Sequence, residues 1–372
     1  MRNISDTLTR LAALRAAAPG GHEDPVPGTF DTLVGFGTNP GALKAKYHVP
    51  AGLRPNAPLV VVLHGCTQDA AGYDHGSGWT TLADQAGFAV LYPEQKRANN
   101  PNLCFNWFMP EDTRRGGGEA CSISDMIGAM ILEHDLDPAR VYITGLSAGG
   151  AMTAVMLATY PELFAGGAII AGLPFGSARS MPEALDRMRG HGGPDAAALG
   201  ALATRASEGH DGPWPTVSIW HGTADFTVAP ANMELIAAQW RELHGTDAAP
   251  DSVETTGNHT RTLWRGGDGR VAIELHEISG MGHGTPIDPG GAEGLGHAMP
   301  HMLDVGVDST ALIARSWGLA DTGWKHAAGR LLNAIVPPAP RPMAPEPAAP
   351  MAAAGGVQKI IEDALRTAGL MR

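Results

Sequence analysis

The 372-residue chain is predicted to fold as an α/β protein with a mostly parallel, doubly wound sheet and helices on both faces. Three observations predict this class. From about residue 45 onward, short apolar runs alternate with longer segments of helical periodicity. The composition, 44% hydrophobic and 17% charged, is that of a compact globular protein. The 49 glycines and 29 prolines indicate many short connections and long loops.

Six buried strands are expected, each a short apolar run bounded by turn-forming residues. They are residues 59–63, 89–92, 141–146, 166–171, 217–220 and 271–278. Helices are expected between them at 79–86, 123–134 and 148–160. The segment 173–215 has no strand signal and is expected to be helical, either as a lid above the sheet or as an ordinary crossover connection.

The main α/β domain is expected to span residues 43–336, with shorter segments on either side. Residues 1–42 should form an N-terminal helix and an extension, because Ile4, Leu8, Leu11 and Leu14 recur at helical spacing. Residues 337–356 are rich in Pro and Ala and should form an extended linker. Residues 357–372 should form a short helix that docks on a partner, on an apolar surface or back on its own domain.

Charge and hydropathy exclude two classes of partner. The formal net charge is −12 and no Lys/Arg-rich run is present, which argues against a nucleic-acid partner. No stretch approaches the roughly 20 consecutive apolar residues of a membrane span. The start of the chain carries Asp6, Arg10 and Arg15 where a signal peptide needs an apolar core, which predicts a cytoplasmic protein, with secretion by another route left open.

The strongest functional motif is GLSAG, residues 145–149, a GxSxG sequence between a predicted strand and a predicted helix. Such a turn holds Ser147 in a strained backbone conformation and presents its hydroxyl at a helix N-terminus, where a developing anion is stabilised. This context predicts that Ser147 is a nucleophile. A tight turn that only happens to contain serine is the alternative.

A serine nucleophile requires a base and an orienting acid, which follow it in the order Asp, His in this type of fold. Asp225 follows the strand 217–220 in WHGTADFTV, and His283 follows the strand 271–278 in SGMGHGTP. Both therefore lie where open α/β sheets place their sites, at the carboxyl ends of strands. A structural turn residue is the alternative for each. Asp247 and Asp251 lack a preceding strand and are weaker candidates.

Two backbone N–H groups must stabilise the tetrahedral intermediate of acyl transfer. The expected donors are Ala148, directly after the nucleophile, and Cys66, in the loop LHGCTQ after an early strand. His64 in the same loop resembles a base, but its tight turn with Gly65 favours a role in supporting the loop.

Two histidines near the end of the main domain form a candidate metal site. His297 and His301 are four residues apart with Asp304 nearby, a spacing that suits metal ligands on a helix. Pro300 interrupts such a helix and no further ligands stand out, so the sequence predicts no metal. The three cysteines, Cys66, Cys104 and Cys121, allow at most one disulfide.

Five motifs together resemble one family. LHGCTQ, CFNWF, GLSAGG, WHGTAD and GMGH occur in the order found in short-chain polyhydroxybutyrate depolymerase esterases, whose relatives include feruloyl and acetylxylan esterases. The resemblance covers roughly Leu43 to Leu319. It implies an α/β-hydrolase fold, no cofactor, the triad Ser147, Asp225 and His283, and Cys66 as a backbone oxyanion donor.

The resemblance also carries finer expectations. Family members grip the polyester with aromatic residues, which match Trp107 in CFNWF and Trp317 in ARSWGL, although core packing is an equal alternative for both. A disulfide between Cys66 and Cys104 would leave Cys121 free. Secreted members have a signal peptide and a polymer-binding domain, and neither is recognised here, which favours an intracellular or oligomeric ester substrate over crystalline polymer.

The sequence therefore predicts a serine carboxylic-ester hydrolase that acts on poly- or oligo(3-hydroxybutyrate) and short-chain esters through an acyl-enzyme. A feruloyl- or acetyl-type esterase acting on plant-derived esters is the alternative among enzymes. A noncatalytic granule or surface binding protein is the alternative of another class, and the intact Ser, Asp and His argue against it. The helix at 357–372 could bind a second copy of the chain or a granule surface.

Overall fold

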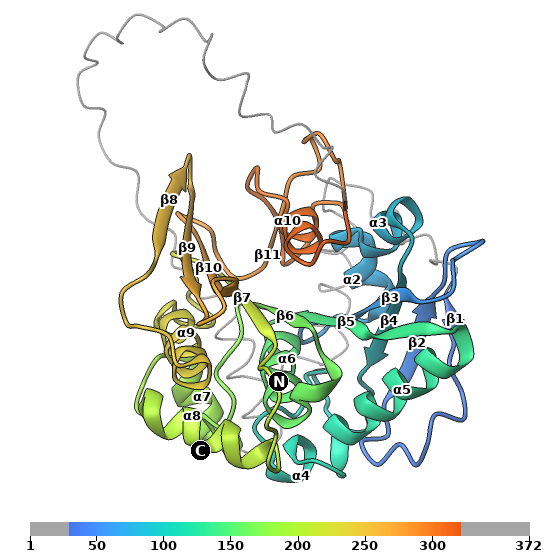
Figure 1. Ribbon diagram of the computed structural model, residues 1–372, viewed down its shortest axis with the longest axis horizontal. Helices are drawn as coiled ribbons and strands as arrows, with labels where there is room; N and C mark the ends of the chain where they lie inside the picture. The colour runs from blue at the N-terminus through green and yellow to red at the C-terminus, as the bar shows by residue number, and fades with distance from the viewer. Residues whose placement is uncertain (1–29, 321–372) are drawn as a thin grey trace, which may run out of the picture.

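The computed structural model describes residues 30–320 (Figure 1). The expected N-terminal helix, the linker at 337–356 and the helix at 357–372 lie outside the described residues. Within residues 30–320, the main sheet has ten strands in the order β1-β2-β4-β3-β5-β6-β7-β10-β9-β8.

The six predicted strands form the parallel centre of this sheet. They are β3 (Ala57–Leu63), β4 (Ala89–Glu94), β5 (Leu136–Leu146), β6 (Gly166–Ile170), β7 (Thr216–Gly222) and β10 (Val271–Ile278). Each pairs in parallel with its neighbours in the order β4-β3-β5-β6-β7-β10. Helices cover both faces of a parallel sheet, so its strands are continuously apolar, and all seven residues of β3 are buried.

Antiparallel strands extend the sheet on both sides. On one side lie β2 (Lys44–His48) and β1 (Asp31–Thr32), and on the other β9 (His259–Arg265) and β8 (Ser252–Thr256). The sequence did not predict these strands, because edge strands expose polar residues. In β8, four of the five residues are exposed. A separate pair, β11 (Thr285–Ile287) and β12 (Met302–Asp304), follows β10.

Two layers of helices enclose the sheet (Figure 1). One face is covered by α5 (Gly118–His134), α6 (Ala148–Thr159) and α9 (Ala231–His244). The other is covered by α2 (Ala70–Ser77), α3 (Trp79–Ala86) and α10 (Ser309–Ser316). The remaining short helices are α4 (Pro110–Thr113), η1 (Pro161–Leu163), α7 (Met181–Met188) and α8 (Ala196–Ala206). This confirms the predicted mostly parallel sheet with helices on both faces.

Two elements begin earlier than predicted, and a third segment resolves an open alternative. The strand predicted at 141–146 begins at Leu136, and the helix predicted at 123–134 begins at Gly118. The segment 173–215 forms α7 and α8 between the neighbouring parallel strands β6 and β7, and α8 packs against α6 and α9. It therefore occupies the position of a crossover connection. Within residues 30–320, no helix is long and apolar enough to cross a membrane.

Candidate active site

The candidate catalytic residues follow three parallel strands at one edge of the sheet. Ser147 comes directly after β5, Asp225 three residues after β7, and His283 five residues after β10. Because parallel strands end at the same edge, the fold brings these loops together. Close packing of the loops supports this, since a Cβ on Gly222, the last residue of β7, would lie 2.2 Å from the carbonyl oxygen of Met281.

Ser147 has the strained backbone expected of a nucleophile turn. Its φ is 57° and its ψ is −117°, outside the regions that serine usually occupies. The turn is held by the Ser147 N–H, which donates to the carbonyl of Ile170 at 2.9 Å, and α6 begins at the next residue. The hydroxyl therefore stands at the start of a 12-residue helix, where the N-terminal dipole favours negative charge.

The two glycines of GLSAG are required by close backbone contacts. A Cβ on Gly145 would lie 2.5 Å from the carbonyl oxygen of Gly149. A Cβ on Gly149 would lie 2.3 Å from the carbonyl oxygen of Leu63, at the end of β3. Neither distance is tolerated by a real side chain, so only glycine lets the nucleophile turn approach the loop that follows β3.

Asp225 and His283 are joined directly. His283 Nδ1 lies 2.7 Å from Asp225 Oδ2, and the Asp225 side chain is fully buried. Burial works against ionisation of this carboxyl, but hydrogen bonds from His221 and His283 outweigh it and hold the pKa of Asp225 well below its usual range. The carboxylate thus stays charged and favours the tautomer of His283 with its proton on Nδ1, so that Nε2 is available to accept a proton.

The weaker acid candidates do not take part in this arrangement. Asp251 accepts the backbone N–H of Arg265 at 2.7 Å, beside the antiparallel edge strand β8. Asp247 is exposed. Among the hydrogen bonds of residues 30–320, none joins the Ser147 hydroxyl to His283, a contact that often tightens only when substrate binds.

The loop that carries Cys66 is fixed by a buried histidine. His64 Nε2 accepts the backbone N–H of Gln95 at 3.1 Å, so the ring carries its proton on Nδ1 and donates it to the carbonyl of Gly65 at 2.8 Å. Burial lowers the pKa of His64 and keeps it neutral. His64 therefore supports the loop, as the sequence predicts.

A disulfide joins Cys66 to Cys104, the pairing that the resemblance implies, and Cys121 is not part of a disulfide. The backbone adds a second connection between the two loops, because the Thr67 N–H donates to the carbonyl of Asn102 at 2.7 Å. The loop with the predicted oxyanion donor is thereby attached to the CFNWF loop.

The CFNWF loop is itself anchored by a buried glutamate that the sequence did not single out. Glu119, at the start of α5, accepts the backbone N–H of Asn106 at 2.8 Å and the side-chain amide of Gln95 at 2.5 Å. Burial, reinforced by the nearby Asp112, raises the pKa of Glu119 to about 8. Its place directly after three glycines, at 116–118, is the only signal in the sequence for this close approach.

The two predicted aromatic binding residues occupy different places. Trp107 lies on the CFNWF loop beside the disulfide, packed edge-on against Phe108, and is mostly buried. Trp317 packs on the opposite face of the sheet from α6, stacked on Tyr142 and Trp79 at ring distances of 4.8 and 5.9 Å. Tyr142 pairs with the first residue of β6, away from the carboxyl edge. Core packing therefore describes Trp317.

The two histidines of the candidate metal site make separate contacts. His297 stacks on His75 at a ring distance of 4.2 Å, whereas His301 Nδ1 contacts the carbonyl of His283 at 3.2 Å. The part of the chain that the structure describes holds no group of three His, Cys, Asp or Glu arranged for a metal. His301 also packs edge-on against the ring of His283 at 5.8 Å, so it belongs to the surroundings of the candidate base.

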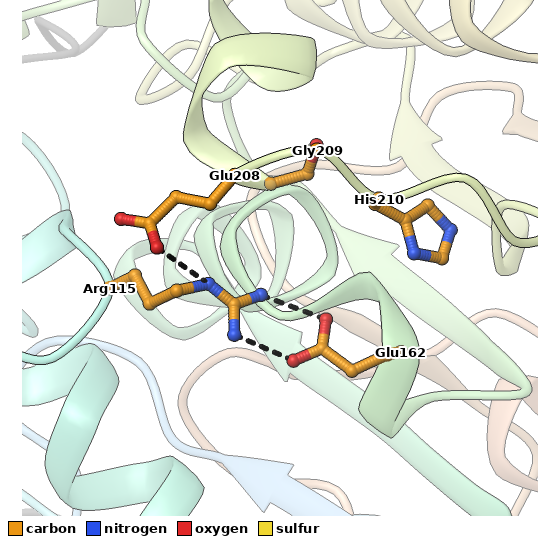
Figure 2. Close-up of a pocket in the computed structure, with 6 residues that line it drawn as sticks. Arg115, Glu162, Glu208, Gly209 and His210 are labelled. Atoms are coloured by element: carbon orange, nitrogen blue, oxygen red, sulfur yellow. Dashed lines mark hydrogen bonds and ion pairs between the residues drawn. The ribbon is translucent and has the colours of Figure 1, made fainter.

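A surface pocket of about 270 Å³ lies away from these residues (Figure 2). Arg115 forms two hydrogen bonds to Glu162, at 2.7 and 2.8 Å, and faces Glu208 at 4.0 Å. It also donates to the carbonyl of Thr159, the last residue of α6, at 2.7 Å. The pocket is therefore at the opposite end of α6 from Ser147, and the Arg115 side chain caps the C-terminus of this helix.

Comparisons with known proteins agree with the geometry at the carboxyl edge. Residues 43–261 match the family model of esterase PHB depolymerases. Poly(3-hydroxyalkanoate) depolymerase C of Paucimonas lemoignei is 49% identical over 285 residues, 76% of this chain and 69% of the relative. Acetylxylan esterase A of Aspergillus ficuum is 34% identical over 277 residues, 70% of this chain and 86% of the relative.

A solved structure has the same fold. Acetyl xylan esterase from Aspergillus awamori superimposes with a TM-score of 0.67 at 28% identity, covering 79% of this chain and all of that one.

Proposed function

The chain belongs to the esterase PHB depolymerase family, and on that premise we propose that it hydrolyses esters of 3-hydroxyalkanoic acids, polymeric or oligomeric, together with short-chain esters. The observation that carries the proposal is the 2.7 Å contact between His283 and the buried Asp225, at the edge of the sheet where the strained Ser147 turn lies. The depolymerase relative, 49% identical, supports the choice of acyl group.

The proposed reaction proceeds through an acyl-enzyme. His283 Nε2 takes the proton of Ser147, whose oxygen attacks the ester carbonyl and forms a tetrahedral intermediate. The backbone N–H groups of Cys66 and Ala148 stabilise the oxyanion. The intermediate collapses as the C–O bond to the alcohol breaks, and His283 returns the proton to the leaving oxygen. Water, activated by His283, then releases the acid and restores Ser147.

Cleavage of acetyl groups from a polysaccharide is the second candidate. It is supported by the acetylxylan esterase relatives at about one third identity and by the likeness to the acetyl xylan esterase structure. The two candidates share the mechanism and differ only in the acyl and alcohol groups, so substrate preference separates them.

The experiment compares the full chain with its Ser147→Ala variant on 3-hydroxybutyrate oligomers, amorphous polyhydroxybutyrate, acetylated xylan and 4-nitrophenyl butyrate. Release of hydroxybutyrate that disappears in the variant supports the proposal. Acetate release without hydroxybutyrate supports the second candidate. A wild-type protein that cleaves none of these and does not react with a fluorophosphonate would support the noncatalytic binding alternative.

The compartment and partners remain predictions. The disulfide between Cys66 and Cys104 supports maturation in an oxidising compartment, because cytosolic thiols are kept reduced, whereas the start of the sequence predicts a cytoplasmic protein. Thiol titration after denaturation of the native protein distinguishes the oxidising compartment from the cytoplasm. One free thiol per chain supports the oxidising compartment, and three free thiols support the cytoplasm. Contact with a second copy or a granule through 357–372 concerns residues outside those described.

A further inference from the structure

The carboxylate of Asp225 is contacted by two histidines, of which only one belongs to the triad. Oδ2 lies 2.7 Å from His283 Nδ1 and 3.2 Å from His221 Nε2. Oδ1 accepts the backbone N–H groups of Thr227 at 2.8 Å and Val228 at 2.9 Å. The triad acid is therefore held by four donors, and His221 shares with His283 the oxygen on which the mechanism depends.

The surroundings of His221 determine its protonation. Its Nε2 lies 2.9 Å from the carbonyl of Val228 and 3.2 Å from Asp225 Oδ2, both acceptors, so Nε2 carries a proton. Its Nδ1 is buried without a hydrogen-bond partner among the described residues. A second proton on Nδ1 would thus be a buried, unpaired charge. The ring is fully buried, and its Nε2–H is the donor to both acceptors.

We propose that His221 is a positioning residue for the triad: its Nε2–H donates to Asp225 Oδ2, fixes the orientation of the carboxylate and limits the basicity of His283. The inference rests on the proposed function. Because His221 takes up part of the charge on Oδ2, its removal strengthens the bond from His283 Nδ1 and favours the imidazolium. The other titratable groups nearby are Glu277, the partner of His221 in the register of β7 and β10, and His301, against the His283 ring.

His221 was not predicted from the sequence, because it lies in a strand beside apolar residues, where a core histidine is expected. The signal that singles it out is its spacing. It stands four residues before Asp225 in WHGTAD, so the turn after β7 folds the acid back onto the strand.

Two variants of similar size separate the donor from its bulk. His221→Met fills the space without a donor, whereas His221→Gln places an amide N–H near the position of Nε2. With 4-nitrophenyl butyrate, we expect kcat of His221→Met to fall roughly 10-fold or more with KM nearly unchanged. The acid limb of its kcat/KM profile should move upward by about 0.5 pH unit or more. His221→Gln should stay within about threefold of wild type.

Two results would overturn the inference. One is a folded His221→Met variant whose acid limb coincides with that of wild type. The other is a His221→Gln variant that is folded but as impaired as His221→Met. Both results would indicate a merely structural role, which would lower activity or stability in the two variants alike and leave the acid limb in place.

A measurement on the wild-type protein decides the matter even where His221→Met fails to fold. The protein is labelled with ¹⁵N-histidine, and the His221 signals are assigned from their loss in the folded His221→Gln variant. We expect the ring of His221 to carry a proton on Nε2. A ring whose Nε2 carries no proton contradicts the inference. Failure of the proposed function is distinct, since wild type would then release no hydroxybutyrate from oligomer or polymer.

Discussion

Burial and charge oppose each other at Asp225. Its side chain has no exposure to solvent, yet four hydrogen bonds hold its pKa well below its usual range. A carboxyl with a lowered folded pKa contributes stability above its unfolded pKa, and this contribution is lost only as the pH falls through the folded value. Asp225 therefore stays ionised at neutral and mildly acidic pH.

Replacement of this carboxylate tests its role in orienting the base. Asp225→Asn should lower kcat by roughly 10³- to 10⁴-fold, because the amide favours the wrong tautomer of His283. Steady-state kinetics on 4-nitrophenyl butyrate measures the effect. Asp251→Asn is the control, since the Asp251 carboxylate accepts the backbone N–H of Arg265 near the sheet edge, and the kcat of this variant should stay close to wild type. Equal activities for the two variants would exclude the orienting role.

Asp308 is a second buried carboxyl, with a different consequence for stability. Its Oδ1 accepts the N–H of Ala311 at the start of α10, while its Oδ2 is buried without a partner among the described residues. Burial raises the pKa of Asp308 from 3.8 to about 7. Between these values the folded state holds a proton that the unfolded state has lost, so stability falls as the pH rises from about 4 to 7.

Asp308→Asn should remove this dependence while it keeps the helix cap, because asparagine is an equally good N-cap residue. The free energy of unfolding of the variant should be nearly equal to that of wild type at pH 4. At pH 8 it should be higher by roughly 2 to 4 kcal/mol. Urea unfolding at the two pH values measures the difference. A gain that is the same at both pH values would show that charge burial at Asp308 is not its cause.

At the scale of elements, the site depends on the close approach of the nucleophile turn to the end of β3. Gly149→Ala places a methyl group 2.3 Å from the carbonyl oxygen of Leu63, so backbone must move. We expect a loss of roughly 2 kcal/mol or more in unfolding free energy and a large loss of activity. In the control Gly128→Ala, on the exposed face of α5, a Cβ meets nothing within 4 Å, and stability should rise by roughly 0.5 to 1 kcal/mol. Equal effects of the two changes on denaturant unfolding would refute this account of the turn.

The disulfide connects two loops rather than two elements of the core. It closes a segment of 38 residues between Cys66 and Cys104. The double variant Cys66→Ala, Cys104→Ala should lose roughly 2 to 4 kcal/mol of unfolding free energy, because the unfolded chain regains freedom. Its kcat should fall more than its KM rises, since the loop with the predicted oxyanion donor is less well held. Unfolding midpoints equal to those of wild type would show that the backbone contact between Thr67 and Asn102 suffices.

For the molecule as a whole, the buried central strands could be predicted from the sequence, whereas the partly exposed strands could not. The six central strands are apolar runs covered on both faces, and all six were predicted. The start of β5 was missed because Asp137, Pro138 and Arg140 interrupt its pattern, and only its pairing with β3 supports it. The edge strands have no apolar run at all, so their formation depends on neighbours far away in the chain.

The same distinction applies to the site. Ser147, Asp225 and His283 could be proposed from the chain because each follows a strand, and the structure brings Asp225 and His283 into contact. His221 and Glu119 could not, because their roles depend on which loops fold onto them. Trp317 carried no signal that separates a binding residue from a core residue, and its position is set by packing against Tyr142.

The central claim, an ester hydrolase with Ser147 as its nucleophile, is tested most directly by covalent trapping. The wild-type protein is treated with a fluorophosphonate, digested and analysed by mass spectrometry, with Ser147→Ala as the control. The account predicts a single adduct on Ser147, loss of 4-nitrophenyl butyrate hydrolysis in proportion to labelling, and no adduct in the variant. An adduct on another serine, or full ester hydrolysis by Ser147→Ala, would contradict it.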